Sequence, residues 1–394
     1  MSRKALTFLF IVVFLDLLGA GILLPIIPYL VRQFRTDATT VGLLSVSFSA
    51  AQFLASPVLG VLSDRYGRRP VLLLSILGTS LGYFLFALAG SLPVMFFARI
   101  LDGITGGNIS TAQAYIADVS APEDRAKNFG LIGAAFGLGF IVGPAVGGVL
   151  STISVHAPAY AAGILALATA IFGYFVLPES LIDHHRDLTR FRISDLSPVK
   201  PLRELLARPE LHLLLAGLFF LNFAFSALQS NFSLFTLVRF GYTPAQNALM
   251  FAYIGVLAAF VQGYAVRRLN PLFGERKLAT LGYAMVIAGF LGIAFARNQW
   301  QLCVAVLGVS GVGFASTAQT ALLSHRVSAR EQGWLLGSLQ SLLSLTRVLG
   351  PLYGGAVFDF IGPPSPYWSG AVWLTVAMVL TRKGARELTS PKTR

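Results

Sequence analysis

Long apolar stretches recur along the chain and strongly limit what it can fold into. Between Ala5 and Arg382, about twelve segments of roughly 20 residues are mostly apolar, and each is long enough to cross a bilayer as a helix. In lipid the backbone must satisfy its own hydrogen bonds, which a helix does within one segment. The sequence therefore predicts an all-α membrane protein with twelve transmembrane helices. The predicted spans are residues 5–33, 41–62, 71–90, 93–117, 127–151, 157–177, 210–238, 245–266, 278–296, 299–324, 332–361 and 365–381.

The composition supports the same fold class. Hydrophobic residues make up 55% of the chain and charged residues only 12%, whereas charged residues are about a quarter of a typical soluble domain. The first apolar stretch continues past Asp16 to Tyr29 without a small-residue cleavage site. We therefore expect a retained span rather than a signal peptide, with the N-terminus in the cytoplasm.

The net charge of +13 is unevenly distributed over the predicted topology. In a soluble protein such a charge would suggest a nucleic-acid partner. With both termini placed inside, however, the outer loops and span ends hold only Arg32, Arg35, Arg239 and Arg297. A basic inner side is typical of membrane proteins. We expect a multi-pass protein of the bacterial cell inner membrane, with both termini cytoplasmic and no nucleic-acid partner.

One long polar stretch, residues 179–209, divides the chain. We predict an N-terminal six-helix half over residues 1–178, a cytoplasmic linker over 179–209, and a C-terminal six-helix half over 210–394 that ends in a short cytoplasmic tail. His184 and His185 lie in the linker with no cysteine or third histidine nearby, so no metal site is predicted. No cofactor is predicted either.

The two halves also repeat in sequence. Residues 63–70 join the second and third spans, and residues 267–277 stand at the matching place in the second half. The pattern Gly-x3-Gly-Pro-x2-Gly-Gly at residues 139–148 returns at residues 346–355 with Thr in first place. The first copy comprises Gly139, Gly143, Pro144, Gly147 and Gly148. Two parallel six-span repeats predict a pseudo-twofold axis along the membrane normal, with a substrate site near mid-membrane between the halves.

A few charged residues lie inside predicted spans: Asp16 in the first, Arg99 and Asp102 in the fourth, and Arg347 in the eleventh. A charge at the bilayer centre costs about 3 kcal/mol or more, so each is a functional candidate. Arg99 and Asp102 are three residues apart and share a helical face. Because a buried carboxylate beside a cation can take up and release a proton, Asp16, Asp102 and Arg99 are the predicted proton-coupling residues. The alternatives are a static ion pair for Asp102 and an acid facing the cytoplasmic vestibule for Asp16.

Two roles are open for Arg347: it neutralises one of the two acids, or it binds an anionic group of the cargo. Two roles are also open for the polar amides within apolar spans. A buried amide needs hydrogen-bond partners, and these belong either to the cargo or to another helix. Together with Arg347, the predicted cargo-binding residues are Asn108, Gln113, Asn222, Gln229 and Gln319.

The segment Gly60-Val-Leu-Ser-Asp-Arg-Tyr-Gly-Arg-Arg-Pro-Val71 resembles the motif between the second and third spans of the major facilitator superfamily. The resemblance implies the twelve-helix fold of that superfamily. An Asp and several Arg at a helix junction can cap a neighbouring helix and form ion pairs that break when the halves separate; the alternative is charge that serves topology alone. The predicted conformational latch consists of Asp64, Arg65, Arg68 and Arg69, with Asp118 as a partner.

The pattern of the fifth span is similar to a motif of the antiporters in that superfamily, which favours export; its alternative role is helix packing alone. A narrower resemblance, to the tetracycline/proton antiporters, covers nearly the whole chain. It is carried by Leu15-Asp16, Arg99 with Gly103-Ile-Thr-Gly106, Ala114-Tyr-Ile-Ala-Asp118 and Leu177-Pro-Glu-Ser180. The chain departs from these antiporters at Val286 and Ala258, where they carry an acidic residue and a histidine.

These features predict a secondary transporter and not an enzyme: a proton-coupled antiporter that exports an amphipathic small molecule, such as a drug or tetracycline-like compound, by alternating access. The expected partners are this small molecule, protons and the lipid bilayer, and the protein is expected to be a monomer. The alternative is a proton-coupled symporter or facilitator for a small organic anion or metabolite. The sequence contains no Gly-x4-Gly-Lys-Ser/Thr run of the kind that binds ATP phosphates.

Overall fold

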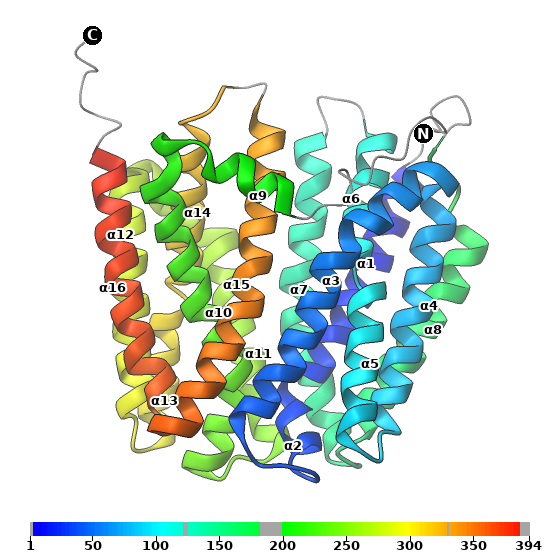
Figure 1. Cartoon of the computed structure of the whole chain (residues 1–394), viewed down its shortest axis with the longest axis horizontal. Coiled ribbons are helices and arrows are strands. Elements are labelled where there is room, and N and C mark those ends of the chain that lie inside the picture. Colours follow the sequence, from blue (N-terminus) through cyan, green and yellow to red (C-terminus); the bar gives the residue numbers. More distant parts are fainter. Residues whose placement is uncertain (1–2, 121–124, 182–198, 329–330, 387–394) are drawn as a thin grey trace. The chain divides into compact units, whose positions relative to one another are not determined.

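The computed structural model describes residues 3–120, 125–181, 199–328 and 331–386 of the chain. All regular elements in these ranges are helices (Figure 1), so the predicted all-α class is confirmed. Within the same ranges, seven helical stretches are long and apolar enough to cross a membrane, and Ile141–Ser151 is a shorter apolar helix. One of the seven, Pro244–Phe295, takes in both the eighth and the ninth predicted span.

The chain forms two compact units. Unit 1 consists of Met1–Thr36, Ser47–Pro198 and Tyr242–Gly255, and unit 2 of Asp37–Val46, Val199–Gly241 and Val256–Arg394. Each unit therefore takes most of its residues from one predicted half and a short segment from the other. The predicted boundaries at residues 178 and 210 stay a prediction. Residues 182–198 of the predicted linker, with His184 and His185, lie outside the described residues.

The helices of unit 1 are α1 (Arg3–Leu23), α2 (Ile27–Val31), α4 (Arg68–Ala87), α5 (Leu92–Thr105), α6 (Asn108–Val119), α7 (Arg125–Ser151) and α8 (Ala157–Val176), with a 3-10 turn at Leu24–Ile26. Those of unit 2 are α9 (Val199–Leu206), α10 (His212–Phe240), α12 (Val266–Phe295), α13 (Gln299–Val309), α14 (Val312–Ser324), α15 (Gln332–Ile361) and α16 (Ser365–Arg386), with a 3-10 turn at Pro209–Leu211 and a π-helical turn at Val261–Ala265. Two helices contribute to both units. They are α3 (Ala38–Tyr66), which changes unit after Val46, and α11 (Pro244–Phe260), which changes unit after Gly255.

The fourth and tenth predicted spans are both interrupted. Gly106 and Gly107 separate α5 from α6, and Ser310 and Gly311 separate α13 from α14. The side-chain amide of Gln52 on α3 donates a hydrogen bond to the carbonyl oxygen of Gly106 at 2.7 Å, which satisfies one backbone group released by the break. Glycine-interrupted spans at corresponding places in two repeats point to the region of a transport site.

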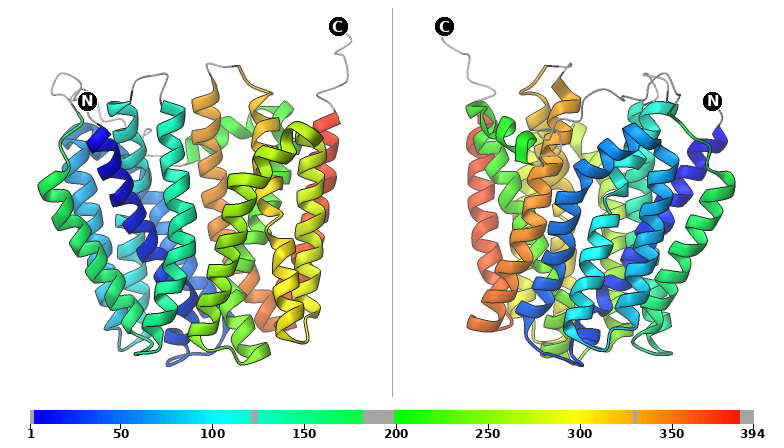
Figure 2. Two further views of the ribbon diagram at one scale, coloured as in Figure 1. Left: turned by 180° about the vertical axis from the view of Figure 1, so that it is seen from behind. Right: turned by 45° about the vertical axis from the view of Figure 1, so that its right-hand side comes forward.

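Small residues of the repeated pattern let helices approach closely in unit 1. At Gly143 on α7, an added Cβ would stand 2.8 Å from the Cα of Gly21 on α1, and these two helices lie side by side (Figure 2). At Gly148 an added Cβ would stand 2.5 Å from the Cβ of Ala248 on α11. The predicted packing residues are therefore divided between two neighbours: Gly139, Gly143 and Gly147 contact α1, and Gly148 contacts α11, while Pro144 lies inside α7.

The first turn of α3 packs on α15 in unit 2. The carboxylate of Asp359 accepts hydrogen bonds from the backbone N–H groups of Ala38 and Thr39 at 2.8 and 2.7 Å, which caps the N-terminus of α3. Gly355 permits the approach, since an added Cβ would lie 2.9 Å from the carbonyl oxygen of Ala38. A carboxylate of unit 2 thus holds the start of a helix that continues into unit 1.

Two glycines in left-handed backbone mark matching junctions of the repeat. Gly67 has φ 104° and ψ 150°, and Gly274 has φ 69° and ψ 162°. A side chain is strongly disfavoured in this region of backbone conformation. Residues 267–277, predicted to join two spans, are largely helical, and the chain changes direction only at Gly274 inside α12. The repetition seen in the sequence therefore extends to the backbone at these two glycines.

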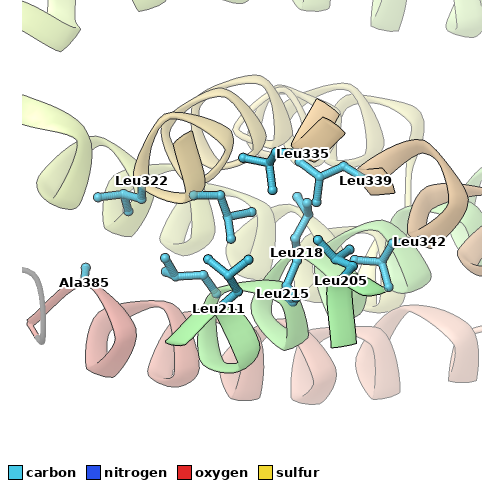
Figure 3. Close-up of a cluster of buried hydrophobic side chains, with 11 residues drawn as sticks. Leu205, Leu211, Leu215, Leu218, Leu322, Leu335, Leu339, Leu342 and Ala385 are labelled. Atoms are coloured by element: carbon cyan, nitrogen blue, oxygen red, sulfur yellow. The ribbon is translucent and has the colours of Figure 1, made fainter. Parts of the chain in front are cut away.

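Helix α9 lies across the end of unit 2 (Figure 1) and is anchored by leucine side chains. Leu205 is fully buried among residues of α10, α14, α15 and α16 (Figure 3). We call this set the leucine cluster; it comprises Leu205, Leu211, Leu214, Leu215, Leu218, Leu322, Leu323, Leu335, Leu339, Leu342 and Ala385. Burial of one such leucine stabilises by about 2 kcal/mol, which explains why a helix of two turns keeps its place.

Polar contacts beside the leucine cluster connect Arg208, two residues after α9, to the start of α15. The Nη2 of Arg208 donates to Oε1 of Glu331 at 2.6 Å, and its guanidinium lies 4.3 Å above the ring of Trp334. The backbone and hydroxyl groups of Ser328 donate to Oε2 of Glu331 at 3.1 and 2.7 Å. These hydrogen bonds, that from Arg208 foremost, lower the pKa of Glu331 from 4.5 to about 2.

Replacing Gly274 with alanine is expected to lower the free energy of unfolding by about 1–3 kcal/mol, because this backbone conformation is strained for any residue with a Cβ. Among the described residues, no heavy atom lies within 4 Å of the added Cβ, so backbone strain alone would cause the loss. Thermal unfolding in detergent measures it. Gly337→Ala is the control, since Gly337 is helical and equally open, and equal unfolding midpoints for the two variants would contradict this explanation.

The contribution of Glu331 to stability is expected to depend on pH. Because its pKa is about 2 in the folded protein and about 4.5 in the unfolded chain, the stabilisation is fully present above about pH 4.5 and is lost as the pH falls towards 2. Thermal unfolding of the wild type and of Glu331→Gln should differ near pH 7, and the difference should shrink below about pH 4.5. Glu210→Gln, an exposed carboxylate at the same end of unit 2, serves as control. A difference that stays constant down to pH 3 would rule out the linkage.

Candidate functional site

A buried ion pair lies on α5 in unit 1. The Nη1 of Arg99 donates to Oδ2 of Asp102 at 2.6 Å, and the two residues are only 9% and 3% exposed. Helical geometry brings the two side chains together, since residues three apart lie on one face. Removing both charges from water costs several kcal/mol per ion, so the pair persists only with additional polar contacts.

Two neighbouring helices surround the pair. The hydroxyl of Thr79 on α4 is hydrogen-bonded to Asp102, and Gly82 on the same helix leaves room for the carboxylate, since an added Cβ would lie 3.0 Å from the Cβ of Asp102. The guanidinium of Arg99 lies 4.2 Å from the ring centroid of Phe48 on α3. Within the described residues, the buried Nε of Arg99 has no hydrogen-bond partner. The pair therefore keeps one donor that is free to bind a further group.

The second predicted acid lies near the pair. Asp16 on α1 is half-buried and is close enough to Asp102 for the two carboxylates to repel each other. The ring of Tyr83 lies next to both acids and contacts α1 at Gly19. Two carboxylates and one guanidinium in a medium of low dielectric are neutral only when one carboxylate holds a proton. Unit 1 thus brings the three predicted proton-coupling residues together in an arrangement that can bind and release one proton.

Arg347 has a different environment on α15 of unit 2. Its side chain is exposed, and no ion pair of Arg347 occurs among the described residues. One turn further along α15, Gly350 contacts the backbone of Phe223 on α10, and the ring of Phe223 lies 5.0 Å from that of Tyr353. Trp373 on α16 extends this aromatic group. An exposed guanidinium can bind an anionic group, and the aromatic rings offer a flat apolar surface.

The predicted amides differ in how fully their polar atoms are used. Gln319 is buried and joins several helices: it accepts from Tyr283 at 2.6 Å and donates to Leu214 and Thr381 at 2.8 and 2.9 Å. This geometry favours the interhelical role over cargo binding, because every polar atom of Gln319 already has a partner.

Three of the other amides, Asn222, Gln113 and Gln229, keep capacity for a ligand. The amide nitrogen of Asn222 donates to the carbonyl oxygen of Leu218 one turn away at 2.9 Å, which leaves its oxygen available. Gln113 is exposed and Gln229 half-buried. The side chain of Asn108 lies outside the described residues.

The predicted latch residues form a network around the start of α4. The Nε of Arg68 donates to Asp118 at 3.1 Å, its Nη1 donates to Ser63 at 2.7 Å, and it also forms an ion pair with Asp64. All of these residues belong to unit 1, so in this structure the network joins α3, α4 and α6. Arg65 lies over the neighbouring ring of Tyr66.

Glu179 completes the network and was not predicted to take part. Its carboxylate accepts hydrogen bonds from the backbone N–H groups of Arg68 and Arg69 at 2.9 and 3.2 Å, which caps α4. Arg69 reaches back to the carbonyl oxygen of Tyr174 at the end of α8. The cap and the capped helix are 111 residues apart, so no local pattern could reveal the pairing; an acid directly after the sixth span was the only signal.

Among the described residues, no group of three His, Cys, Asp or Glu side chains could hold a metal ion. The residues brought together are instead charged and aromatic groups within helices. Such groups suit the binding of a proton and of a small amphipathic molecule.

The chain matches known proteins over nearly its whole length. The sequence pattern of the Major Facilitator Superfamily matches residues 9–338 and 272–393. The tetracycline resistance protein, class C, of Escherichia coli is 34% identical, with 98% of each chain covered. Multidrug resistance protein 2 of Bacillus subtilis (strain 168) is 30% identical, with 88% of this chain and 87% of that protein covered.

A solved structure is similar too. The human organic anion transporter TETRAN is 28% identical, with a TM-score of 0.73 and coverage of 96% of this chain and 99% of that one. The predicted fold, twelve helices in two six-helix repeats, is thereby confirmed, and the protein is a multi-pass transporter rather than an enzyme. From its all-helical fold, its repeated glycine junctions and these matches, we conclude that the chain belongs to the major facilitator superfamily.

Proposed function

We propose that the protein is a proton-coupled antiporter that exports an amphipathic small molecule. The observation that carries the proposal is the buried pair of Arg99 and Asp102 with Asp16 close by. A membrane protein keeps such charges only where they serve transport or pair permanently. The unpartnered Nε of Arg99 argues against a purely static pair, and relatives named for tetracycline and multidrug resistance support drug export.

The proposed cycle uses competition between a proton and cargo. When Asp102 and Asp16 are both ionised, their two charges exceed the single charge of Arg99, and a proton or a cationic cargo group can neutralise the excess. Binding of cargo then makes the proton leave, and binding of a proton makes the cargo leave. If the site can hold either the proton or the cargo but not both, and if it opens alternately to the two sides of the membrane, the two ligands are exchanged across the membrane.

Arg347 and the aromatic group of unit 2 are proposed to bind an acidic group and an apolar part of the cargo. An exposed guanidinium attracts a carboxylate or phenolate, and the rings of Phe223 and Tyr353 offer an apolar surface. The departures at Val286, which is buried, and Ala258 remove the acid and the histidine of the tetracycline/proton antiporters. We therefore propose that the cargo is an amphipathic molecule other than tetracycline. It carries either an acidic group alone or both an acidic and a basic group.

The network around Arg68 is proposed to act as the conformational latch of unit 1. Breaking it exposes the N-terminus of α4 and removes several charge-assisted hydrogen bonds at once. We place this end, with both termini, in the cytoplasm of a bacterial cell with an inner membrane, because the basic residues gather there, and we propose a monomer as the working unit.

A second candidate is a proton-coupled symporter or facilitator for a small organic anion. The exposed side chain of Arg347 favours it, as does the resemblance to a human organic anion transporter. The direction of proton movement relative to cargo separates the two candidates.

The test uses the purified protein in proteoliposomes with an imposed pH gradient. Cationic, neutral and anionic amphipathic compounds are added in turn to the wild type, Asp102→Asn and Asp16→Asn, and a pH-sensitive dye follows the gradient. We expect at least one compound to dissipate the gradient with the wild type. The rate should fall more than about tenfold in either variant, because an amide cannot carry the proton.

Glu210→Gln is the matched control, since it removes an exposed carboxylate that is far along the chain from Asp16 and Asp102. Exchange of labelled cargo across the membrane without a gradient should persist in Asp102→Asn, which would show that this variant is folded. Compounds that cross at equal rates in all variants without moving protons would contradict the coupling. Protons and cargo moving in the same direction would favour the symporter.

A further inference from the structure

A cavity of about 700 Å³ lies between α12 and α16 in unit 2, with Leu322 of α14 in its wall. It is at the end of these helices where the leucine cluster lies, and α12 and α16 run side by side there (Figures 1 and 2). None of the charged or aromatic residues assigned to proton or cargo binding lines it. It is lined by Phe273, Arg276, Lys277, Thr280, Leu281, Tyr283, Ala284, Leu322, Met378, Thr381, Arg382, Ala385 and Arg386.

The charges of this cavity have one sign. Four basic side chains line it, from Arg276, Lys277, Arg382 and Arg386, and its lining includes no acidic residue from the part of the chain that the structure describes. All four are exposed. The Nε of Arg382 donates to the hydroxyl of Thr280 at 3.3 Å, which directs its guanidinium across from α16 to α12. Four cations from two helices therefore lie around one cavity. Orientation in the membrane does not require basic residues to gather in this way, whereas binding of a phosphate group does.

The remaining wall is mostly apolar, with hydroxyl groups from Thr280, Tyr283 and Thr381, and it is open to the outside of the unit. Phe273 and Leu281 on α12 are 47% and 39% exposed although both line the cavity. Leu322 and Ala385 form the inner wall and belong to the leucine cluster (Figure 3). A free phosphate ion would leave this apolar surface unused. A molecule with a phosphate at one end and a hydrocarbon chain at the other would cover both parts.

We propose that this cavity binds a phospholipid with an anionic headgroup. The phosphate lies among the four basic side chains, and an acyl chain runs along Leu281 and Ala284 between α12 and α16. A zwitterionic lipid fits less well, because its ammonium group would stand among four cations. The site is independent of the proposed antiport, since it requires neither Asp102 nor Arg347.

A second cavity on α12 offers an internal comparison. It has a volume of about 660 Å³, lies between α12 and α13 at the other end of α12, and is lined by Trp300 and several glycines with only one basic residue, Arg297. This second cavity has a similar volume but one basic residue instead of four. We therefore expect the cavity between α12 and α16, and not this one, to distinguish anionic from zwitterionic lipid.

The test is native mass spectrometry of the purified full-length protein with palmitoyl-oleoyl phosphatidylglycerol or the phosphatidylcholine with the same chains. We expect one phosphatidylglycerol to bind at least about tenfold more tightly than phosphatidylcholine, since each basic residue near a headgroup contributes about fivefold. The variant with Arg276→Gln, Lys277→Gln, Arg382→Gln and Arg386→Gln should lose this preference. The control variant with Lys200→Gln, Arg203→Gln, Arg267→Gln and Arg268→Gln removes the same charge from exposed sites outside the cavity and should keep it.

A cavity-filling variant separates the site from charge in general. Ala284→Trp leaves all four basic residues in place but fills the apolar part, and it should weaken phosphatidylglycerol binding at least about tenfold, in line with the many contacts an acyl chain makes there. Val372→Trp, on an exposed part of α16 outside the cavity, should have no effect. The proposal is overturned if the control variants lose binding equally, if both lipids bind equally to the wild type, or if millimolar inorganic phosphate displaces the lipid.

Discussion

The buried contact between Arg99 and Asp102 is the interaction on which the account of this protein depends. Two ions removed from water within an apolar helix bundle are stable only while they hold each other and their polar neighbours. Here α3 supplies the ring of Phe48 and α4 supplies Thr79 and the space at Gly82. A second acid, Asp16, disturbs the charge balance. A group that neutralises either acid therefore changes how strongly three helices are held together.

Repetition gives both units the same backbone features but different side chains. Gly67 and Gly274 turn the chain at matching junctions, and paired breaks interrupt the fourth and tenth spans. Unit 1 places its acids beside such a break. Unit 2 instead carries Arg347 and an aromatic group. In the proposed function, the acids of unit 1 bind a proton or a cationic group of the cargo, and Arg347 in unit 2 binds an acidic group.

Much of the fold follows from the sequence because hydrophobic length and repeated motifs are local signals. They predicted the helical class, the twelve spans and the two repeats, and the pairing of Arg99 with Asp102 needed only the spacing of three residues. Contacts between distant segments could not be predicted in this way. Glu179 caps a helix that begins 111 residues earlier, and Asp359 caps α3 from α15. The full hydrogen bonding of Gln319 likewise depends on three helices that only the folded chain brings together.

The most direct test of proton and cargo competition is the release of protons on binding. A cargo identified by transport is added to the purified protein in weakly buffered detergent solution near neutral pH, and a pH indicator records the protons that appear. We expect cargo binding to release protons from the wild type and none from Asp102→Asn, although that variant still binds cargo. Binding without proton release in the wild type, or equal release from Asp102→Asn, would contradict it.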